Sequence, residues 1–506
     1  MQNTDRGKCA AMRRAVAYMS VTIASFEKRA VVSKMAVLFR HLRPSMSLAP
    51  EAFRTIDAHT LRHRLNNGDE LALLDVREAG QFGEGHPFFA IPQPFSRLEL
   101  DAPRLLPRKS VRIALVDDGI ADTSVAQRAA TRLQRLSIAT SRFSRAGVRG
   151  WREAGYTLFL GVNVPSKTFG ELVEHAYGTP HVSVQQLRRW QAERSGCPLA
   201  LIDGRTRAEH RKMTIPGAVC VPNAELAAHV DAFAGATDTT IVVHCAGRTR
   251  SIIGAQTLHN LGIRRDVFTL ENGTQGWALA GFTLEHGSTR SPADAWPSDV
   301  ERKEARARAQ ALAQCFGVST LDDATARTLY LLDVRTPEDY ARDGRSIATH
   351  APGGQLVQAN DQSVAGRGAR LLLIDYDGIR APVVAHWLVQ LSFETAFVDA
   401  ADAARWPTPD RADVQPEEPA AAPPASHAVV LDLRPSAAHE IAQPAGSRWT
   451  IRSCVFETLR QADAHRDTPI VLFADAAAHA AARLVADNLR EAGFAEVTTI
   501  SGGLDA

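Results

Sequence analysis

Short runs of apolar, largely β-branched residues recur along the chain, and each leads into a stretch with apolar residues at helical spacing. Four of these runs read "VRIALVDDG", "TIVVHCAGR", "RLLLIDYDG" and "PIVLFADAA". Strands that are apolar throughout and alternate with helices are typical of a parallel sheet covered on both faces. The pattern therefore predicts an α/β fold.

A second phrase precedes each run and shows that the chain is built from repeats. It reads "LLDVRE", "LIDGRT", "LLDVRT" and "VLDLRP", with the aspartates Asp75, Asp203, Asp333 and Asp432. These aspartates stand about 100 to 130 residues apart, which is the size of a domain and not of a solenoid repeat. A third phrase closes the first two repeats, as "GVRGWREAGY" and "NGTQGWALAGF". Each repeat is thus predicted to form its own sheet.

The spacing of these phrases predicts the domain organisation. We expect an extension over residues 1–45, repeats over 46–162, 175–290 and 298–407, a linker over 408–426, and a truncated fourth repeat over 427–506. The basic extension is interpreted as a disordered segment or mis-assigned start. The linker is rich in proline and alanine, which favours an extended tether. Residues 298–316 read as a charged helix that is capped by Ser298.

Composition narrows the classes of function. The chain has 506 residues, 45% of them hydrophobic and 23% charged, and its net charge is +2. This balance gives no general attraction to nucleic acid or to an anionic membrane, and no apolar run approaches the roughly 20 residues of a membrane-spanning helix. Six cysteines without a CxxC pair argue against structural zinc and a disulfide framework. We expect reduced thiols, a cytoplasmic location, and neither a metal nor an organic cofactor.

One of these cysteines stands where a predicted strand meets a predicted helix. In "TIVVHCAGRTRS" the strand runs into Cys245, a short loop follows, and the helix is expected from Ser251. Ligands collect at the carboxyl ends of parallel strands, and the free N–H groups of a helix N-terminus attract anions. With Arg248 and Arg250 beside it, this loop favours the thiolate. Cys245 is therefore predicted to be a reactive nucleophile.

The length of the loop separates two chemistries. Tyrosine-phosphatase-like enzymes place five residues between cysteine and arginine, which encloses a tetrahedral phosphate. Here four residues separate Cys245 from Arg250. A shorter loop curls its amides around a single atom bonded to the cysteine sulfur, which suits a persulfide.

Taken together, the phrases of the second repeat resemble the rhodanese family. They are the D-x-R phrase, "IPGA" at 215–218, the "HCAGRTRS" loop and the closing "NGTQGW", in the family's order over residues 180–290. Weaker copies cover most of the remaining chain. The resemblance implies tandem rhodanese-like domains, each a parallel sheet flanked by helices on both faces. It also implies a sulfurtransferase that takes a sulfane sulfur from thiosulfate or a similar donor and passes it to cyanide or a thiol.

The resemblance assigns roles to residues of the second repeat. Cys245 would carry the sulfur as a persulfide in a double-displacement cycle, and Arg248 and Arg250 would attract the anionic donor. The loop residues expected to hold the sulfur are Ala246, Gly247, Arg248, Thr249 and Arg250. Asp203 and Arg205 are interpreted mainly as a structural ion pair near the site, and Trp277 as a core or rim residue. The family often has histidine where this chain has Thr214.

The other three repeats lack the nucleophile. Aligning the apolar runs places Asp117, Asp375 and Ala474 at the position of Cys245. A carboxylate or a methyl group does not carry a sulfane sulfur, so these repeats are predicted to be inactive. Arg380 keeps the place of Arg250, and we interpret it as a paired or surface arginine.

Two alternatives remain for the second repeat. Cys245 could accept sulfur from a partner desulfurase, with protein persulfides as donor or acceptor, in a relay without turnover of free thiosulfate. A cysteine-dependent phosphatase is a remote alternative because of the short loop. Cys220 is expected in a buried strand, and His244 is interpreted as a packed residue and not as a general base.

Overall fold

A computed structural model describes most of the chain. The described residues are 55–120, 124–138, 142–144, 147–193, 198–234, 238–292, 297–318, 327–344, 347–398, 402 and 427–501. The predicted extension, the predicted linker, Cys9 and Cys197 lie outside these residues. No helix within the described ranges is long and apolar enough to cross a membrane.

The first sheet belongs mainly to the first repeat. Its strands are ordered β1-β5-β4-β2-β13, with β3 beside β2. The strands of this repeat are β1 (Thr55–Ile56), β2 (Leu71–Asp75), β3 (Ile91–Pro92), β4 (Ile113–Val116) and β5 (Arg142–Ser144). The helices are α2 (Ala58–Asn66), α3 (Ala79–Glu84), η1 (Phe95–Arg97), α4 (Leu98–Leu105), α5 (Val125–Arg135) and α6 (Gly147–Glu153). Every residue of β2 and β4 is buried, as expected for strands covered on both faces.

The second sheet carries Cys245 at the end of a central strand. Its order is β6-β10-β9-β7-β8, from β6 (His181–Val182), β7 (Leu199–Asp203), β8 (Val219–Cys220), β9 (Thr240–His244) and β10 (Val267–Leu270). The associated helices are α7 (Val164–Tyr177), α8 (Val184–Glu193), α9 (Arg207–Lys212), η3 (Asn223–Glu225), α10 (Leu226–Ala234), α11 (Thr249–Asn260) and α12 (Gly273–Leu279). Most of α7 falls between the boundaries predicted for the first two repeats, and it packs on α11.

The third and fourth sheets repeat the same plan. The third, β12-β11-β14-β15, contains β11 (Leu329–Asp333), β12 (Thr349–His350), β14 (Arg370–Ile374) and β15 (Glu394–Phe397). Its helices are α13 (Asp299–Cys315), α14 (Pro337–Asp343), α15 (Gly353–Gln358), η4 (Asn360–Gln362) and α16 (Arg380–Gln390). The fourth, β17-β16-β18-β19, contains β16 (Val429–Asp432), β17 (Arg448–Trp449), β18 (Ile470–Ala474) and β19 (Val497–Ser501), with α18 (Ser436–Ile441), α19 (Val455–Gln461) and α20 (His479–Glu491).

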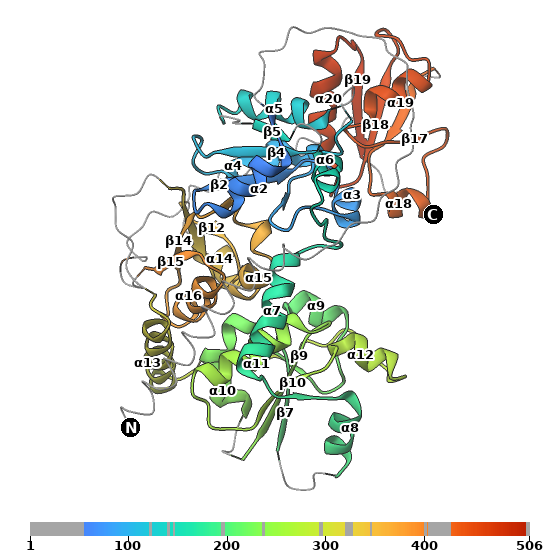
Figure 1. Ribbon diagram of the computed structural model, residues 1–506. Coiled ribbons are helices and arrows are strands. Elements are labelled where there is room, and N and C mark those ends of the chain that lie inside the picture. The colour runs from blue at the N-terminus through green and yellow to red at the C-terminus, as the bar shows by residue number, and fades with distance from the viewer. Residues whose placement is uncertain are drawn as a thin grey trace.

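The predicted fold class is confirmed, with one addition. Neighbouring strands within each repeat are parallel, and helices flank the sheets (Figure 1). The addition is β13 (Gly366–Arg367), which leaves the third repeat and pairs antiparallel with β2 of the first. Helix α13 begins at the predicted cap, since Ser298 accepts a hydrogen bond from the N–H of Glu301.

The repeats pack in an order different from their order in the sequence. The fourth repeat lies beside the first at one end of the molecule, and the second repeat lies at the other end. The third repeat lies between the first and the second (Figure 1). The second and third repeats share a core in which Phe169, Ile252 and Trp387 are buried together. The first and fourth are joined by Arg452, whose Nη2 lies 2.7 Å from Oε1 of Glu99. The second repeat therefore packs against the third repeat through a shared hydrophobic core.

Candidate active site

Strand register brings the four loop positions into correspondence. The aspartate of each D-x-R phrase pairs with the residue that precedes the loop. The pairs are Asp75 with Val116, Asp203 with His244, Asp333 with Ile374, and Asp432 with Phe473. The next residues are Asp117, Cys245, Asp375 and Ala474. The structure thus places at one position the four residues that the apolar runs aligned.

Cys245 follows β9 directly and is almost fully enclosed. Its exposure is 2%, and the thiol is free. Its Sγ lies 3.7 Å from Oγ of Ser251, and that hydroxyl donates a hydrogen bond of 2.7 Å to the carbonyl of Arg248. Ser251 was part of the quoted loop but received no role from the sequence. A hydroxyl at this place can turn its proton toward an anionic sulfur.

The helix after Cys245 begins closer to the thiol than predicted. Helix α11 starts at Thr249 and not at Ser251, so the helical conformation begins two residues closer to Cys245 than the sequence predicted. Arg248 at the N-cap makes no side-chain cap bond. Within the described residues no hydrogen bond uses the N–H of Ala246, Gly247 or Arg248. The amides of this helix end therefore have no backbone acceptor among the described residues, and such unpaired N–H groups attract anions.

The closing "NGTQGW" phrase holds the loop in place. The N–H of Thr274 donates to the carbonyl of Cys245 at 2.9 Å, and the N–H of Gln275 donates to that of Ala246 at 3.0 Å. Gly273 has φ +48, and a Cβ there would lie 2.0 Å from the carbonyl oxygen of Cys245. Only glycine allows this approach. Trp277 is 2% exposed and donates to the carbonyl of Thr283, so it is a core residue.

The two loop arginines are not directed at a free anion site. Arg248 forms bonds of 3.0 and 3.1 Å with Glu171 and also contacts Glu174, both on α7. Arg250 forms bonds of 2.6 and 2.7 Å with Glu209. Burial alone would raise the pKa of Glu209, but Arg250 outweighs it and holds that pKa below its usual value. The expected attraction of an anionic donor is therefore opposed by carboxylates already paired with these cations.

The D-x-R pair has the geometry of a structural anchor. Nε and Nη2 of Arg205 lie 2.9 and 2.8 Å from the two oxygens of Asp203, and Asp203 is fully buried. Burial would raise the pKa of Asp203, yet the neighbouring His244 and the bonds from His210 and Arg205 keep it well below its usual value. Thr214 donates to the same carboxylate at 2.9 Å. The corresponding pairs at Asp75, Asp333 and Asp432 have the same form, although those repeats lack the thiol.

The neighbouring polar side chains do not provide a second nucleophile or a strong base. Burial lowers the pKa of His244 to about 4, so its imidazole is neutral near pH 7. Burial raises the pKa of Cys220 to about 12, and this thiol is 2% exposed. Both agree with the expected core roles. Cys315 is disulfide-bonded, so the expectation of reduced thiols does not hold for that residue.

In the third repeat a carboxylate occupies the place of the sulfur. Asp375 is fully buried and accepts from the N–H groups of Gly378, Ile379 and Ala381 at 3.0, 3.0 and 2.8 Å. Burial, with Asp377 nearby, raises the pKa of Asp375. Arg380 is bound to Glu225 of the second repeat at 2.6 Å. The paired interpretation of Arg380 is thus the one observed.

Sequence reasoning missed the acidic partners of the loop. Glu209 stands three residues after Thr206, and this Thr-x-x-Glu pattern is a capping box that could have marked it. Glu171 and Glu174 lie on a separate helix, and nothing local marks them. In the described part of the chain no group of three or more His, Cys, Asp or Glu residues could hold a metal ion.

Known proteins were compared with the chain. A family model described as the rhodanese-like domain matches residues 183–280, which include the Cys245 loop. A solved structure of thiosulfate sulfurtransferase from Pseudomonas aeruginosa is 37% identical, covers 90% of this chain and 88% of its own, and has a TM-score of 0.78. No curated protein matches.

Two further solved structures are much more distant. A rhodanese-related protein from Thermoplasma volcanium is 23% identical, covering 21% of this chain and 99% of its own with a TM-score of 0.19. A protein of unknown function from Rhodopseudomonas palustris, described as a possible tyrosine phosphatase, is 21% identical, covering 26% and 97% with a TM-score of 0.20. At such scores neither bears on the choice between chemistries.

Proposed function

The chain belongs to the rhodanese-like sulfurtransferase family, and we propose that it transfers a sulfane sulfur from thiosulfate or a similar small donor through Cys245. The observation that carries this proposal is the second-repeat loop. A nearly buried thiol lies at the end of β9 beside an uncapped helix N-terminus, with four residues before Arg250.

The proposed cycle has two displacement steps. The Cys245 thiolate attacks the outer sulfur of thiosulfate, a bond forms between the two sulfurs, and the sulfur–sulfur bond of thiosulfate breaks to release sulfite. Cyanide or a thiolate then attacks the outer sulfur of the persulfide, which frees the Cys245 thiolate and yields thiocyanate or a new persulfide. No electron carrier is needed, because the sulfur is transferred from donor to acceptor without a change in its oxidation level.

The loop residues would act mainly on the persulfide. The N–H groups from Ala246 to Arg250 belong to the loop and to the first turn of α11, where they would stabilise a terminal anionic sulfur as oxyanion-hole donors stabilise oxygen. Ser251 adds a hydroxyl at 3.7 Å from Sγ. The enclosure of Cys245 keeps water away from the reactive sulfur.

A relay is the second candidate, and the ion pairs of the loop favour it. Arg248 and Arg250 are already bound to carboxylates, so a free dianion meets little uncompensated positive charge at the loop. In this version a partner desulfurase loads Cys245 directly, and a protein thiol receives the sulfur. A cytoplasmic location, where Cys245 stays reduced, belongs to both versions.

Thiocyanate formation from thiosulfate and cyanide separates the two candidates. The full chain is compared with Cys245→Ala and with Cys454→Ser, a matched control at an exposed thiol. Turnover that is lost in Cys245→Ala and kept in Cys454→Ser supports the sulfurtransferase. A persulfide on Cys245 without turnover supports the relay. Hydrolysis of an aryl phosphate that depends on Cys245 would contradict both.

A further inference from the structure

Asn223, the first residue of η3, is buried against the first turn of α11. Its exposure is 6%, and its Nδ2 donates a hydrogen bond of 2.8 Å to the carbonyl of Arg250. Its Oδ1 has no hydrogen-bond partner in the part of the chain that the structure describes. Arg250 belongs to the helix end that follows Cys245. The Asn223 amide therefore restrains the turn whose N–H groups lie nearest the thiol.

Two glycines make the space that this amide occupies. A Cβ at Gly204 would lie 2.2 Å from Oδ1 of Asn223, and a Cβ at Gly254 would lie 2.7 Å from the same atom. Gly204 is the middle residue of the D-x-R phrase, and Gly254 lies on α11. Because protein interiors are close-packed, a side chain at either place would displace the amide. Asn223 and the two glycines thus form one arrangement.

The repeats without the thiol have different residues at these positions. The N–H of Asn223 donates to the carbonyl of Gly204 at 3.2 Å, and Phe95 in the first repeat and Gly353 in the third make the same backbone bond at 3.1 and 3.0 Å. Neither Phe95 nor Gly353 has a side-chain amide. In place of Gly204, the first, third and fourth repeats have Val76, Val334 and Leu433. The arrangement therefore accompanies Cys245 and is not a general property of the fold.

The short helix η3 also connects this turn to the third repeat. Glu225, two residues after Asn223, accepts bonds of 2.6 and 2.8 Å from Arg380, and both side chains are buried. A Cβ at Gly353 would lie 2.9 Å from the Cβ of Ala224, so α15 packs closely on η3. Three consecutive residues of the second repeat thus join the Cys245 loop to a repeat that lacks the thiol.

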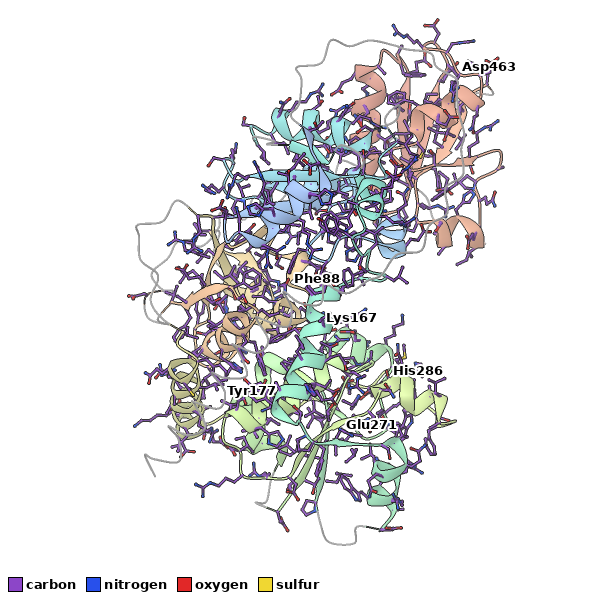
Figure 2. The ribbon with its side chains drawn as sticks, in the orientation of Figure 1. Phe88, Lys167, Tyr177, Glu271, His286 and Asp463 are labelled. Carbon is purple, nitrogen blue, oxygen red and sulfur yellow. The ribbon has the colours of Figure 1, made fainter. Side chains whose placement is uncertain are left out.

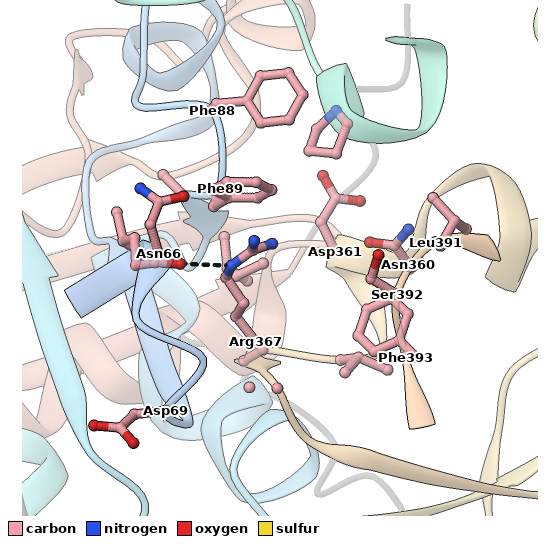
Figure 3. A pocket seen from close by; sticks show the side chains of 18 of the residues that line it. Asn66, Asp69, Phe88, Phe89, Asn360, Asp361, Arg367, Leu391, Ser392 and Phe393 are labelled. Atoms are coloured by element: carbon pink, nitrogen blue, oxygen red, sulfur yellow. Dashed lines mark hydrogen bonds between the residues drawn. The ribbon is translucent and has the colours of Figure 1, made fainter. Parts of the chain in front are cut away.

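The third repeat is itself held on two sides. Toward the second repeat, the hydroxyl of Tyr177 on α7 donates to Oε1 of Gln390 at 2.8 Å (Figure 2). Toward the first repeat, Nε of Arg367 donates to the carbonyl of Leu65 at 2.8 Å, beside a cavity of about 420 Å³ that lies apart from the Cys245 loop (Figure 3). These contacts give η3 a fixed support.

We propose that Asn223 is a positioning residue for sulfur transfer, which holds the first turn of α11 so that the loop amides face the sulfur on Cys245. Arg380 of the third repeat holds Asn223 in turn, through Glu225. The inference rests on the proposed function. Asn223 acts through the carbonyl of Arg250 and not on the sulfur itself. Donors that are held in place before the reaction stabilise an anion better than donors that must first be ordered.

The equilibrium of persulfide formation on the full chain measures this positioning. The Cys245 thiolate and thiosulfate give the persulfide and sulfite, so intact-protein mass spectrometry at fixed ratios of thiosulfate to sulfite yields the equilibrium constant. Asn223→Ala should lower this constant by about fivefold or more in the folded protein, because the loop amides lose their fixed position. A residue that only supported the fold would leave the constant of the folded protein unchanged.

Thr257→Val is the matched control. Thr257 also lies on α11, is buried, and accepts the N–H of Trp387 from the third repeat at 2.9 Å. The substitution removes a buried hydrogen bond between the same two repeats, but two turns away from the loop. It should lower the free energy of unfolding and leave the equilibrium constant within about twofold of the wild type.

A double variant separates positioning from folding. Gly204→Val alone should destabilise the protein, because its side chain meets the Asn223 amide. Combined with Asn223→Gly it copies Val334 and Gly353 of the third repeat, so the fold should recover while the equilibrium constant stays about fivefold lower.

The outcomes distinguish the inference from the proposed function. A wild-type equilibrium constant in folded Asn223→Ala or in the folded double variant would overturn the inference and leave the proposed function intact. A fivefold loss in Thr257→Val would overturn it as well, since any damage to the interface between the two repeats would then suffice. A wild-type protein that forms no persulfide would refute the proposed function, and the inference with it.

Discussion

The loops of the second and third repeats occupy equivalent places in the fold, but one begins with Cys245 and the other with Asp375. Each follows the central strand that pairs with a buried D-x-R aspartate, and each leads into a helix with arginine in its first turn. In the third repeat the Asp375 carboxylate accepts three N–H groups of that turn. In the second, Sγ of Cys245 lies 3.7 Å from Oγ of Ser251, and it accepts no backbone N–H among the residues that the structure describes. In the third repeat a carboxyl group accepts these N–H groups, and in the second repeat we propose that the anionic sulfur of a persulfide does so.

The first and fourth repeats extend the comparison. Asp117 accepts from the N–H groups of Gly119 and Ala126 at 3.0 and 3.1 Å. In the fourth repeat, Asp475, one residue after Ala474, accepts from the N–H of Ala478 at 2.9 Å. Each repeat without the thiol therefore satisfies its helix start with its own carboxylate. The second repeat leaves that task to the sulfur it would carry.

Replacing Cys245 by aspartate converts the second loop into a copy of the third. Cys245→Asp should lower thiocyanate formation by on the order of 10³-fold or more, because the nucleophile is gone and its place holds a fixed anion. The variant should stay folded, since the carboxylate can accept the same amides. Initial rates measure the loss of thiocyanate formation, and urea unfolding shows whether the variant stays folded. A variant with more than a few per cent of wild-type activity would refute Cys245 as the sulfur carrier.

Emptying the third loop should mainly cost stability. Asp375→Ala takes the acceptor away from the N–H groups of Gly378 and Ala381, while the N–H of Ile379 keeps Oδ1 of Asp377, and we expect a loss of about 2–4 kcal/mol in the free energy of unfolding. Asp475→Ala, which removes a single cap bond in the fourth repeat, should cost about 1 kcal/mol. Urea denaturation measures both. Equal costs would mean that Asp375 does not fill its cradle as described.

His244 gives the second loop a pH dependence of its own. Its folded pKa of about 4 is below the ordinary 6.5, so its contribution to stability is present above pH 6.5 and is lost as pH falls toward 4. His244→Val, which copies Val116 of the first repeat, should make the free energy of unfolding fall less steeply with decreasing pH, by at most about 1.4 kcal/mol per pH unit. Urea unfolding between pH 7 and 4.5 reports this. Superimposable pH profiles would argue against a neutral, buried His244.

Two glycines near Cys245 should respond differently to substitution, because a Cβ at Gly273 meets the backbone of the loop and a Cβ at Gly247 does not. Gly273→Ala forces a Cβ against the Cys245 carbonyl at positive φ, and it should cost about 1–3 kcal/mol and displace the loop. Gly247→Ala meets only the Gln275 side chain at 3.6 Å and should be tolerated structurally. Thermal unfolding and thiosulfate kinetics on both variants test this. The account fails if Gly247→Ala is the more damaging of the two.

The smallest predicted effect concerns Arg248, whose charge is paired with two carboxylates of α7. Glu171→Gln combined with Glu174→Gln removes the carboxylates on Arg248 and should lower KM for thiosulfate by about 2- to 5-fold at low salt, because Arg248 is partly exposed and screened. The gain should shrink with added NaCl. Glu153→Gln, which neutralises one exposed acid on α6, serves as a control for surface charge. An unchanged KM would show that the donor does not approach along Arg248.

Local pattern was enough to align the loops, and it failed where distant segments meet. The apolar strands and D-x-R phrases placed Asp117, Cys245 and Asp375 at one position, because strand and turn chemistry are encoded within a few residues. The start of α11 was misplaced by two residues, since no cap residue marks it. The ion pairs of Arg248 with α7 and the pairing of β13 with β2 join segments far apart in sequence, so periodicity carries no sign of them.

Intact-protein mass spectrometry after incubation with thiosulfate tests the central claim most directly. We predict a mass increase of one sulfur atom on the wild type, located on the peptide that contains Cys245 and removed by cyanide, with no increase on Cys245→Ser. Sulfur found instead on Cys454, or an unmodified Cys245 in a folded protein, would contradict the account of an anion cradle left vacant for a persulfide.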